Sequence, residues 1–179
     1  MSVWIALFRG INVGGNNKLP MKELTRVMLN AGLTEVKTYI ASGNVVFRSG
    51  HDEATLEALI GDLIETHFGF RCKVFLITLP HLLAVMAANP YKDHELKGKA
   101  QHVFFLKAAP KSVDHDLLNS LKAGNEAYEV GEHAIYLYAP DGIGRSKMVE
   151  KWDRAIKADM TARNLNTVET LLAMAREYA

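Results

Sequence analysis

The sequence predicts an α+β protein, and three observations point to that class. Apolar residues alternate in short stretches such as "VWIALFR" at 3–9, which is the period of a half-buried strand. Between these stretches they recur at i, i+3 and i+4, the period of an amphipathic helix. The first 79 residues then read β-α-β-β-α-β, the order of a ferredoxin-like subdomain with four antiparallel strands and both helices on one face.

Start and stop signals place the N-terminal elements. Pro20 suits the first position of a helix, and Gly32 suits the left-handed residue that ends it. Gly43-Asn44 between two apolar stretches is typical of a two-residue type II′ hairpin turn. The predicted elements are strand 3–9, helix 20–31, strands 36–41 and 44–49, helix 53–68 and strand 72–78.

The second half repeats part of this order, which predicts a related but degenerate α+β subdomain with C-terminal helices. We therefore expect subdomains at 1–79 and 80–179, with the charged, aperiodic segment 89–100 as a linker. Helical sequence follows its last predicted strand in place of a fourth strand. The predicted elements are helix 80–88, strand 102–107, helix 112–122, strands 126–130 and 134–139, and a helix beginning after Ser146 that turns Met148, Trp152, Ala155 and Ile156 inward.

Composition indicates a cytoplasmic globular protein. The 179 residues are 49% hydrophobic and 23% charged, with a net charge of +1 that gives no general attraction to DNA or membranes. No apolar run is long enough to span a bilayer, so we expect no membrane association. The single cysteine, Cys72, forms no internal disulfide and lies in strand-like sequence rather than in a redox motif.

The loop "RGINVGGNNK" at 9–18 invites comparison with phosphate-binding motifs. Its glycines are spaced G-x-x-x-G-G, which does not match the dinucleotide fingerprint G-x-G-x-x-G. Gly10 and Gly15 fit the spacing of a P-loop, but Asn16 and Asn17 replace its lysine and hydroxyl residue. This excludes an NTPase of that class and leaves a tight strand-to-helix turn or another anion site.

The predicted topology brings polar groups to one edge of the first sheet. The first and third strands are antiparallel neighbours, so the 9–18 loop and the 42–44 hairpin meet beside the start of the first helix, whose free amides attract anions. The predicted ligand-binding residues at this edge are Arg9, Asn12, Lys18, Ser42 and Asn44.

A second polar cluster lies near the C-terminus. There "NTVE" at 166–169 resembles a capping box, and Lys147, Lys151 and Arg154 form a basic stripe that suits a solvated helix face. The predicted anion-binding residues in this region are Arg145, Ser146, Lys147, Thr161, Arg163 and Asn164.

Several other chemistries lack their signals. Ser42 has no G-x-S-x-G context, the seven histidines show no metal-binding spacing, and no strand matches the RNA-recognition motif. We expect no metal and no cofactor.

Three stretches resemble the signature blocks of the bacterial domain-of-unknown-function family number sixteen-ninety-seven: "LFRGINVGG" at 7–15, "YIASGNVVF" at 39–47, and "GIGRSK" with "TARNLNTV" at 142–147 and 161–168. The resemblance implies a cytosolic protein of two α+β subdomains. It implies no activity, substrate, cofactor or catalytic residue.

The signature blocks are rich in Arg, Lys, Asn, Ser and Thr, which donate hydrogen bonds, and poor in residues that act as a general base. The leading hypothesis is therefore binding of an anionic ligand, either a phosphorylated small molecule or a nucleic acid backbone. One alternative is an enzyme acting on a phosphorylated or carboxylated substrate, with Arg9, Lys18 or Lys147 stabilising developing charge. Another is a structural or partner-binding module without a ligand.

Overall fold

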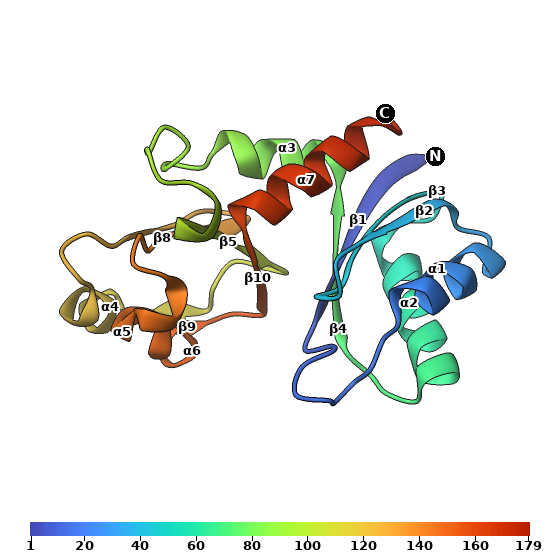
Figure 1. Cartoon of the computed structure of the whole chain (residues 1–179), viewed down its shortest axis with the longest axis horizontal. Helices are drawn as coiled ribbons and strands as arrows, with labels where there is room; N and C mark the ends of the chain where they lie inside the picture. Colours follow the sequence, from blue (N-terminus) through green and yellow to red (C-terminus); the bar gives the residue numbers. More distant parts are fainter. The chain divides into compact units, whose positions relative to one another are not determined.

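The computed structural model describes residues 1–179, which divide into two compact units (Figure 1). Unit 1 comprises residues 1–83 and 171–179, and unit 2 comprises residues 84–170. Each unit holds a four-stranded antiparallel sheet with helices, which confirms the predicted α+β class. None of the helices is long and apolar enough to cross a bilayer.

The sheet of unit 1 has the strand order β2-β3-β1-β4. The first and third strands are antiparallel neighbours, as predicted, with Leu7 opposite Asn44. Most predicted bounds agree with the structure to within two residues. The elements are β1 (Ser2–Arg9), α1 (Met21–Asn30), β2 (Thr34–Tyr39), β3 (Asn44–Ser49), α2 (Glu53–Phe68) and β4 (Lys73–Thr78).

The core of unit 1 lies between its sheet and the two helices α1 and α2, which cover the same face (Figure 1). Leu24 and Met28 of α1 are fully buried there, as are Leu56 and Ile60 of α2. These residues follow the helical period of the sequence, so burial of one apolar stripe explains why each segment is a helix. The packing fixes the strand ends from which the polar loops of this unit leave.

Unit 2 repeats the arrangement with the strand order β10-β5-β8-β7. Its fourth strand corrects the prediction, because residues 160–164 pair with β5 where helical sequence was expected. From residue 79 onward the elements are α3 (Leu79–Ala87), η1 (Gly98–Ala100), β5 (Gln101–Leu106), β6 (Ser112–Val113), α4 (His115–Leu121), β7 (Ala127–Val130), β8 (Ala134–Tyr138), η2 (Ile143–Arg145), α5 (Lys147–Glu150), α6 (Trp152–Ala155), β9 (Ile156–Lys157), β10 (Met160–Asn164) and α7 (Leu165–Arg176).

Segment 89–100 belongs to unit 2 and is anchored there by its buried ends, although residues 92–97 are exposed. The Asn89 side chain donates from Nδ2 to Gln101 Oε1 at 3.1 Å, and Gln101 donates from Nε2 to the carbonyl of Tyr91 at 2.8 Å. All three residues are buried. Hydrogen bonds among buried polar side chains therefore order this segment despite its lack of apolar period.

The single helix predicted after Ser146 is two short helices followed by a strand. The helix breaks at Lys151, between α5 and α6, and Ile156 starts strand β9. The inward positions are nevertheless as predicted, since Met148, Trp152, Ala155 and Ile156 are all buried. Trp152 packs on Phe104 of β5 with ring centroids 5.0 Å apart.

Candidate functional site

The 10–20 loop of unit 1 is held in shape by asparagine side chains. Asn12 donates from Nδ2 to the carbonyl oxygens of Leu19 (3.0 Å) and Ala41 (2.7 Å), and its Oδ1 accepts from the Leu19 amide at 2.7 Å. Asn17 donates from Nδ2 to the carbonyl of Gly10 at 3.0 Å. These amide groups replace the regular backbone pairing that the turn lacks.

Asn12 and Asn17 also have left-handed backbones, with φ of 53° and 49°. Asparagine tolerates this conformation better than other residues with a side chain. The two residues are thereby explained by the turn itself. The bond from Asn12 to Ala41 also joins the loop to the hairpin, which confirms that the two meet at this edge of the sheet.

The hairpin differs from the predicted two-residue turn. Tyr39 pairs with Asn44, so residues 40–43 form a four-residue loop and Asn44 belongs to β3. Asn44 is fully buried and donates from Nδ2 to the Tyr39 carbonyl at 2.9 Å and to Ser42 Oγ at 3.1 Å. These bonds favour the longer loop, because the Asn44 side chain closes it.

Arg9 and Lys18 are the cationic members of this predicted edge. Both are exposed, and neither takes part in an ion pair of the structure. They flank a loop in which the Asn12 and Asn17 side chains serve the loop's own conformation. Their part in binding a ligand remains a prediction.

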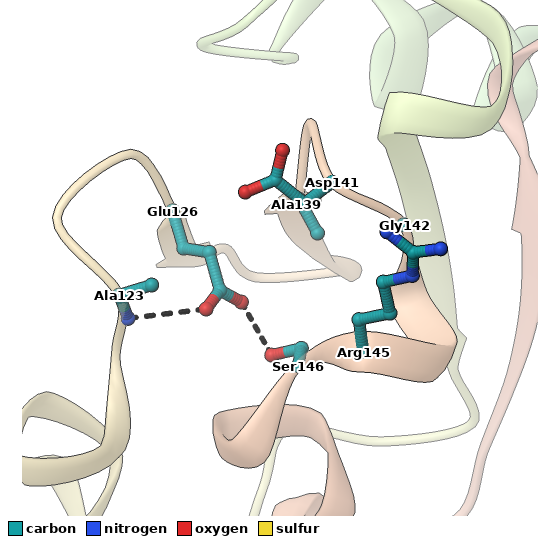
Figure 2. A pocket seen from close by; sticks show the side chains of 7 residues that line it. All are labelled: Ala123, Glu126, Ala139, Asp141, Gly142, Arg145 and Ser146. Carbon is teal, nitrogen blue, oxygen red and sulfur yellow. Dashed lines mark hydrogen bonds between the residues drawn. The ribbon is translucent and has the colours of Figure 1, made fainter.

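The predicted residues Arg145 and Ser146 line a cavity in unit 2 (Figure 2). Its volume is about 250 Å³. Ser146 ends η2 and caps α5, since its Oγ accepts from the Val149 amide at 3.2 Å. Lys147, the next residue, is exposed and does not line this cavity. The other lining residues are Ala123, Glu126, Ala139, Asp141 and Gly142.

A buried carboxylate at this cavity is hydrogen-bonded to Ser146. Glu126 is 9% exposed, accepts from the Ala123 amide at 3.0 Å through Oε1, and accepts from the Ser146 hydroxyl through Oε2. Figure 2 shows both bonds converging on the carboxylate. Both donors are neutral groups, so the Glu126 carboxylate is held by hydrogen bonds and not by an ion pair.

Two further charges lie at the same cavity. The Arg145 guanidinium is exposed and joins no ion pair, whereas the carboxylate of Asp141 accepts from Asn125 Nδ2 at 2.8 Å. The site thus offers a cation that is free to bind an anionic group and carboxylate oxygens that accept hydrogen bonds. Such a cavity suits a small molecule that has both kinds of group.

The predicted residues of the 161–164 segment do not line this cavity. Arg163 is 8% exposed and donates from one guanidinium nitrogen to Thr161 Oγ1 (3.0 Å) and to the Ala162 carbonyl (2.8 Å). Burial lowers the pKa of Arg163 to about 10. The guanidinium therefore stays charged at neutral pH, and it lies within the fold at the edge strand β10.

Asn164 rather than Asn166 caps α7. Its Oδ1 accepts from the Thr167 amide at 2.9 Å, and the helix begins at Leu165. The predicted capping box at 166–169 is therefore wrong by two residues, because Leu165 is buried and starts the helix earlier.

Sequence reasoning missed the acidic residues of the cavity, Glu126 and Asp141. They come from two turns that are far apart in sequence and outside the signature blocks. A charged residue in a turn is ordinarily solvated, so nothing local marked Glu126 as buried. The one available signal was its place as the first residue of the predicted strand 126–130, which the structure begins at Ala127.

The lone thiol can be tested as a nucleophile, and we expect it to react slowly in the folded protein. Burial raises the pKa of Cys72 from 9.0 to about 11. The thiolate is the reactive form, so near pH 8 the folded protein carries about 100-fold less of it than an exposed cysteine would. Ellman's reagent should label Cys72 far faster in urea than in buffer. Equal rates would contradict this.

Comparison with known proteins agrees with this description. The family model described as "Protein of unknown function (DUF1697)" matches residues 1–136. A solved structure, that of the conserved bacterial protein SP0830 from Streptococcus pneumoniae, is similar with a TM-score of 0.74 and 25% identity, over 97% of this chain and 98% of that chain. No curated protein matches the chain. Because the family model covers more than half of the residues, the chain belongs to this family of proteins of unknown function.

Proposed function

We propose that the protein binds a small molecule carrying an anionic group together with hydroxyl or amino donors, in the cavity of unit 2. One observation carries the proposal: the unpaired Arg145 guanidinium and the buried Glu126 carboxylate line the same cavity. Arg145 would hold a phosphate or carboxylate of the ligand by charge-assisted hydrogen bonds. Glu126 and Asp141 would accept from its donors.

The carboxylates narrow the class of ligand. A simple polyanion such as a nucleic acid backbone would bring its negative charge against Glu126 and Asp141, which is unfavourable in a partly enclosed site. A sugar phosphate or an amino acid would instead satisfy both kinds of group. The volume of about 250 Å³ lies just below the roughly 300–1,000 Å³ of typical small-molecule sites, so the cavity admits a small metabolite and excludes a nucleotide or a larger molecule.

The proposal is tested by screening sugar phosphates, amino acids and nucleotides for thermal stabilisation, followed by calorimetric titration of the best ligand. We expect Arg145→Ala to weaken binding by about 10-fold or more, because a hydrogen bond to a charged group contributes roughly 1.5–3 kcal/mol. Glu126→Gln should also weaken binding, since it replaces a charged acceptor with a neutral amide.

Lys147→Ala is the matched control. It removes the same charge from the neighbouring exposed position, so it should bind like the wild-type protein. Arg9→Ala tests the edge of unit 1 in the same assay. Binding that survives Arg145→Ala but is lost in Arg9→Ala would overturn the proposal and favour the predicted edge at the 9–18 loop.

A further inference from the structure

A second hollow in unit 2 is lined by three lysine residues. Its volume is about 510 Å³, twice that of the cavity in Figure 2. None of its lining residues belongs to the signature blocks or to the predicted site. We call it the lysine hollow; it is lined by Lys107, Ala108, Ala109, Lys111, Lys157, Ala158 and Asp159.

Backbone hydrogen bonds frame the lysine hollow at both ends. The Lys107 amide donates to the Asp159 carbonyl at 3.1 Å, and the Lys111 amide donates to the Lys157 carbonyl at 2.8 Å. Between these bonds, residues 108–110 lie opposite the single residue Ala158. The longer segment must bow away from the shorter one, as in a bulge, and this opens the space.

The residues of the bowed segment suit an open, fixed hollow. Ala108 and Ala109 have small side chains that leave the space unfilled, and Pro110 has a fixed φ and no amide that needs a partner. Beyond Lys111 the pairing continues into the ladder of β6 and β9, where Ser112 lies opposite Lys157. The hydrogen bond between Lys111 and Lys157 at one end of the hollow is therefore continuous with the paired strands β6 and β9.

The residues that line the lysine hollow carry an excess of positive charge, although the net charge of the whole chain is only +1. Three lysines and one aspartate line it. Lys111 is exposed and makes no ion pair, and the ammonium of Lys157 donates to the Asp153 carbonyl at 3.2 Å, a neutral group that leaves its charge uncompensated. Lysines that line one concave space attract a compact anion more strongly than the same lysines spread over a surface.

We propose that the lysine hollow binds the phosphate groups of a small phosphorylated molecule. The volume lies within the range of roughly 300–1,000 Å³ that is typical of small-molecule sites. Lysine acts as a mobile point charge that suits phosphate without demanding one geometry. A nucleic acid is less suited, because the lysines surround a hollow and do not form the extended basic stripe that follows a backbone.

The test is a nuclear magnetic resonance titration of the full chain with pyrophosphate at low ionic strength. We expect the largest shifts at the amides of Ala108, Ala109 and Ala158. Lys111→Ala and Lys157→Ala should each raise the dissociation constant by about fivefold, the effect of losing one exposed charge contact. Ala109→Phe should abolish binding by filling the hollow without changing any charge, and an unchanged amide spectrum elsewhere would show that this variant folds.

Lys122→Ala is the matched control, because it removes an exposed lysine of unit 2 that does not line the hollow. It should leave the dissociation constant unchanged. An equal loss in Lys122→Ala, or full binding in Ala109→Phe, would show unspecific attraction and overturn the proposal. So would tighter binding of a single-stranded decanucleotide than of pyrophosphate. Shifts confined to the amides of Gly142 and Ser146 would place the anion in the cavity of Figure 2 and would also overturn the proposal.

Discussion

Gly43→Ala is expected to lower the free energy of unfolding of unit 1 by about 3 kcal/mol, the sum of a backbone strain and an overpacking cost. Gly43 has a φ of 90°, which residues with a side chain rarely adopt. A methyl group at this position would also lie 2.8 Å from Phe8 Cβ and 2.5 Å from Ile11 Cδ1. Because Phe8 Cβ is attached to the backbone of the central strand β1, it cannot move aside cheaply.

Substitutions at two other glycines of unit 1 distinguish the cost of backbone strain from the cost of overpacking. Gly14 has a positive φ of 58°, and a methyl group added there would have no atom within 4 Å. Gly14→Ala should therefore cost about 1 kcal/mol of the unfolding free energy, from backbone strain alone. Gly61→Ala lies within α2, with an ordinary backbone and nothing near its new methyl group, so it should stabilise by about 0.5–1 kcal/mol.

The chain offers a reporter for each unit, because its two tryptophans are Trp4 of β1 and Trp152 of α6. Urea unfolding of Trp152→Phe variants, followed by tryptophan fluorescence, reads the environment of Trp4 in unit 1. From the lowest to the highest free energy of unfolding, we expect the order Gly43→Ala, Gly14→Ala, the protein without a glycine substitution, and Gly61→Ala. A cost of Gly43→Ala no larger than that of Gly14→Ala would mean that the approach to Phe8 is not a constraint.

The fold could be predicted wherever one apolar face follows a clear period. Helix α2 is an example, because Leu56, Ile60 and Ile64 are all buried at a spacing of four and Gly69 ends the helix with a left-handed φ. The neighbourhood of β1 and β3 followed from the order of the elements alone. In both cases local propensity, the burial pattern and the topology favour the same structure, so the prediction is correct.

There is a physical reason why strand β10 could not be predicted from the sequence. It is an edge strand that pairs with β5 on one side only, and two of its buried positions hold Thr161 and Arg163. A buried arginine does not register as part of an apolar pattern. The strand therefore looked like a polar cluster, although it completes the same four-stranded order that unit 1 has.

Only part of the candidate site could be predicted from the sequence, because the rest of it depends on the fold. Arg145 and Ser146 were found from their polar signature block, and they do line a cavity. Glu126 was not found, because its burial depends on the fold bringing a distant turn over η2. The sequence therefore suggested a site for an anion, whereas the cavity combines one cation with two carboxylates and calls for a ligand with donors as well.

Asn44→Ala is expected to cost about 1–3 kcal/mol of the unfolding free energy of unit 1, the cost of leaving buried polar groups without their partners. Asn44 is fully buried, and its amide bonds to Tyr39 and Ser42 close the four-residue hairpin loop. Without them the Tyr39 carbonyl loses a donor at the point where strand pairing ends. The loss should appear in the Trp4 fluorescence transition.

Asn125→Ala is the matched control, because Asn125 also donates one side-chain hydrogen bond, to Asp141, but at the surface of unit 2. Water can replace that bond, so the cost, measured by Trp152 fluorescence in a Trp4→Phe background, should stay below about 0.5 kcal/mol. If Asn44→Ala costs no more than this, the residue does not hold the hairpin, and its place in the signature block calls for a ligand after all. A large cost with unchanged ligand binding would instead assign Asn44 and the hairpin to the fold, leaving Arg9 and Lys18 as the residues at that edge able to bind an anion.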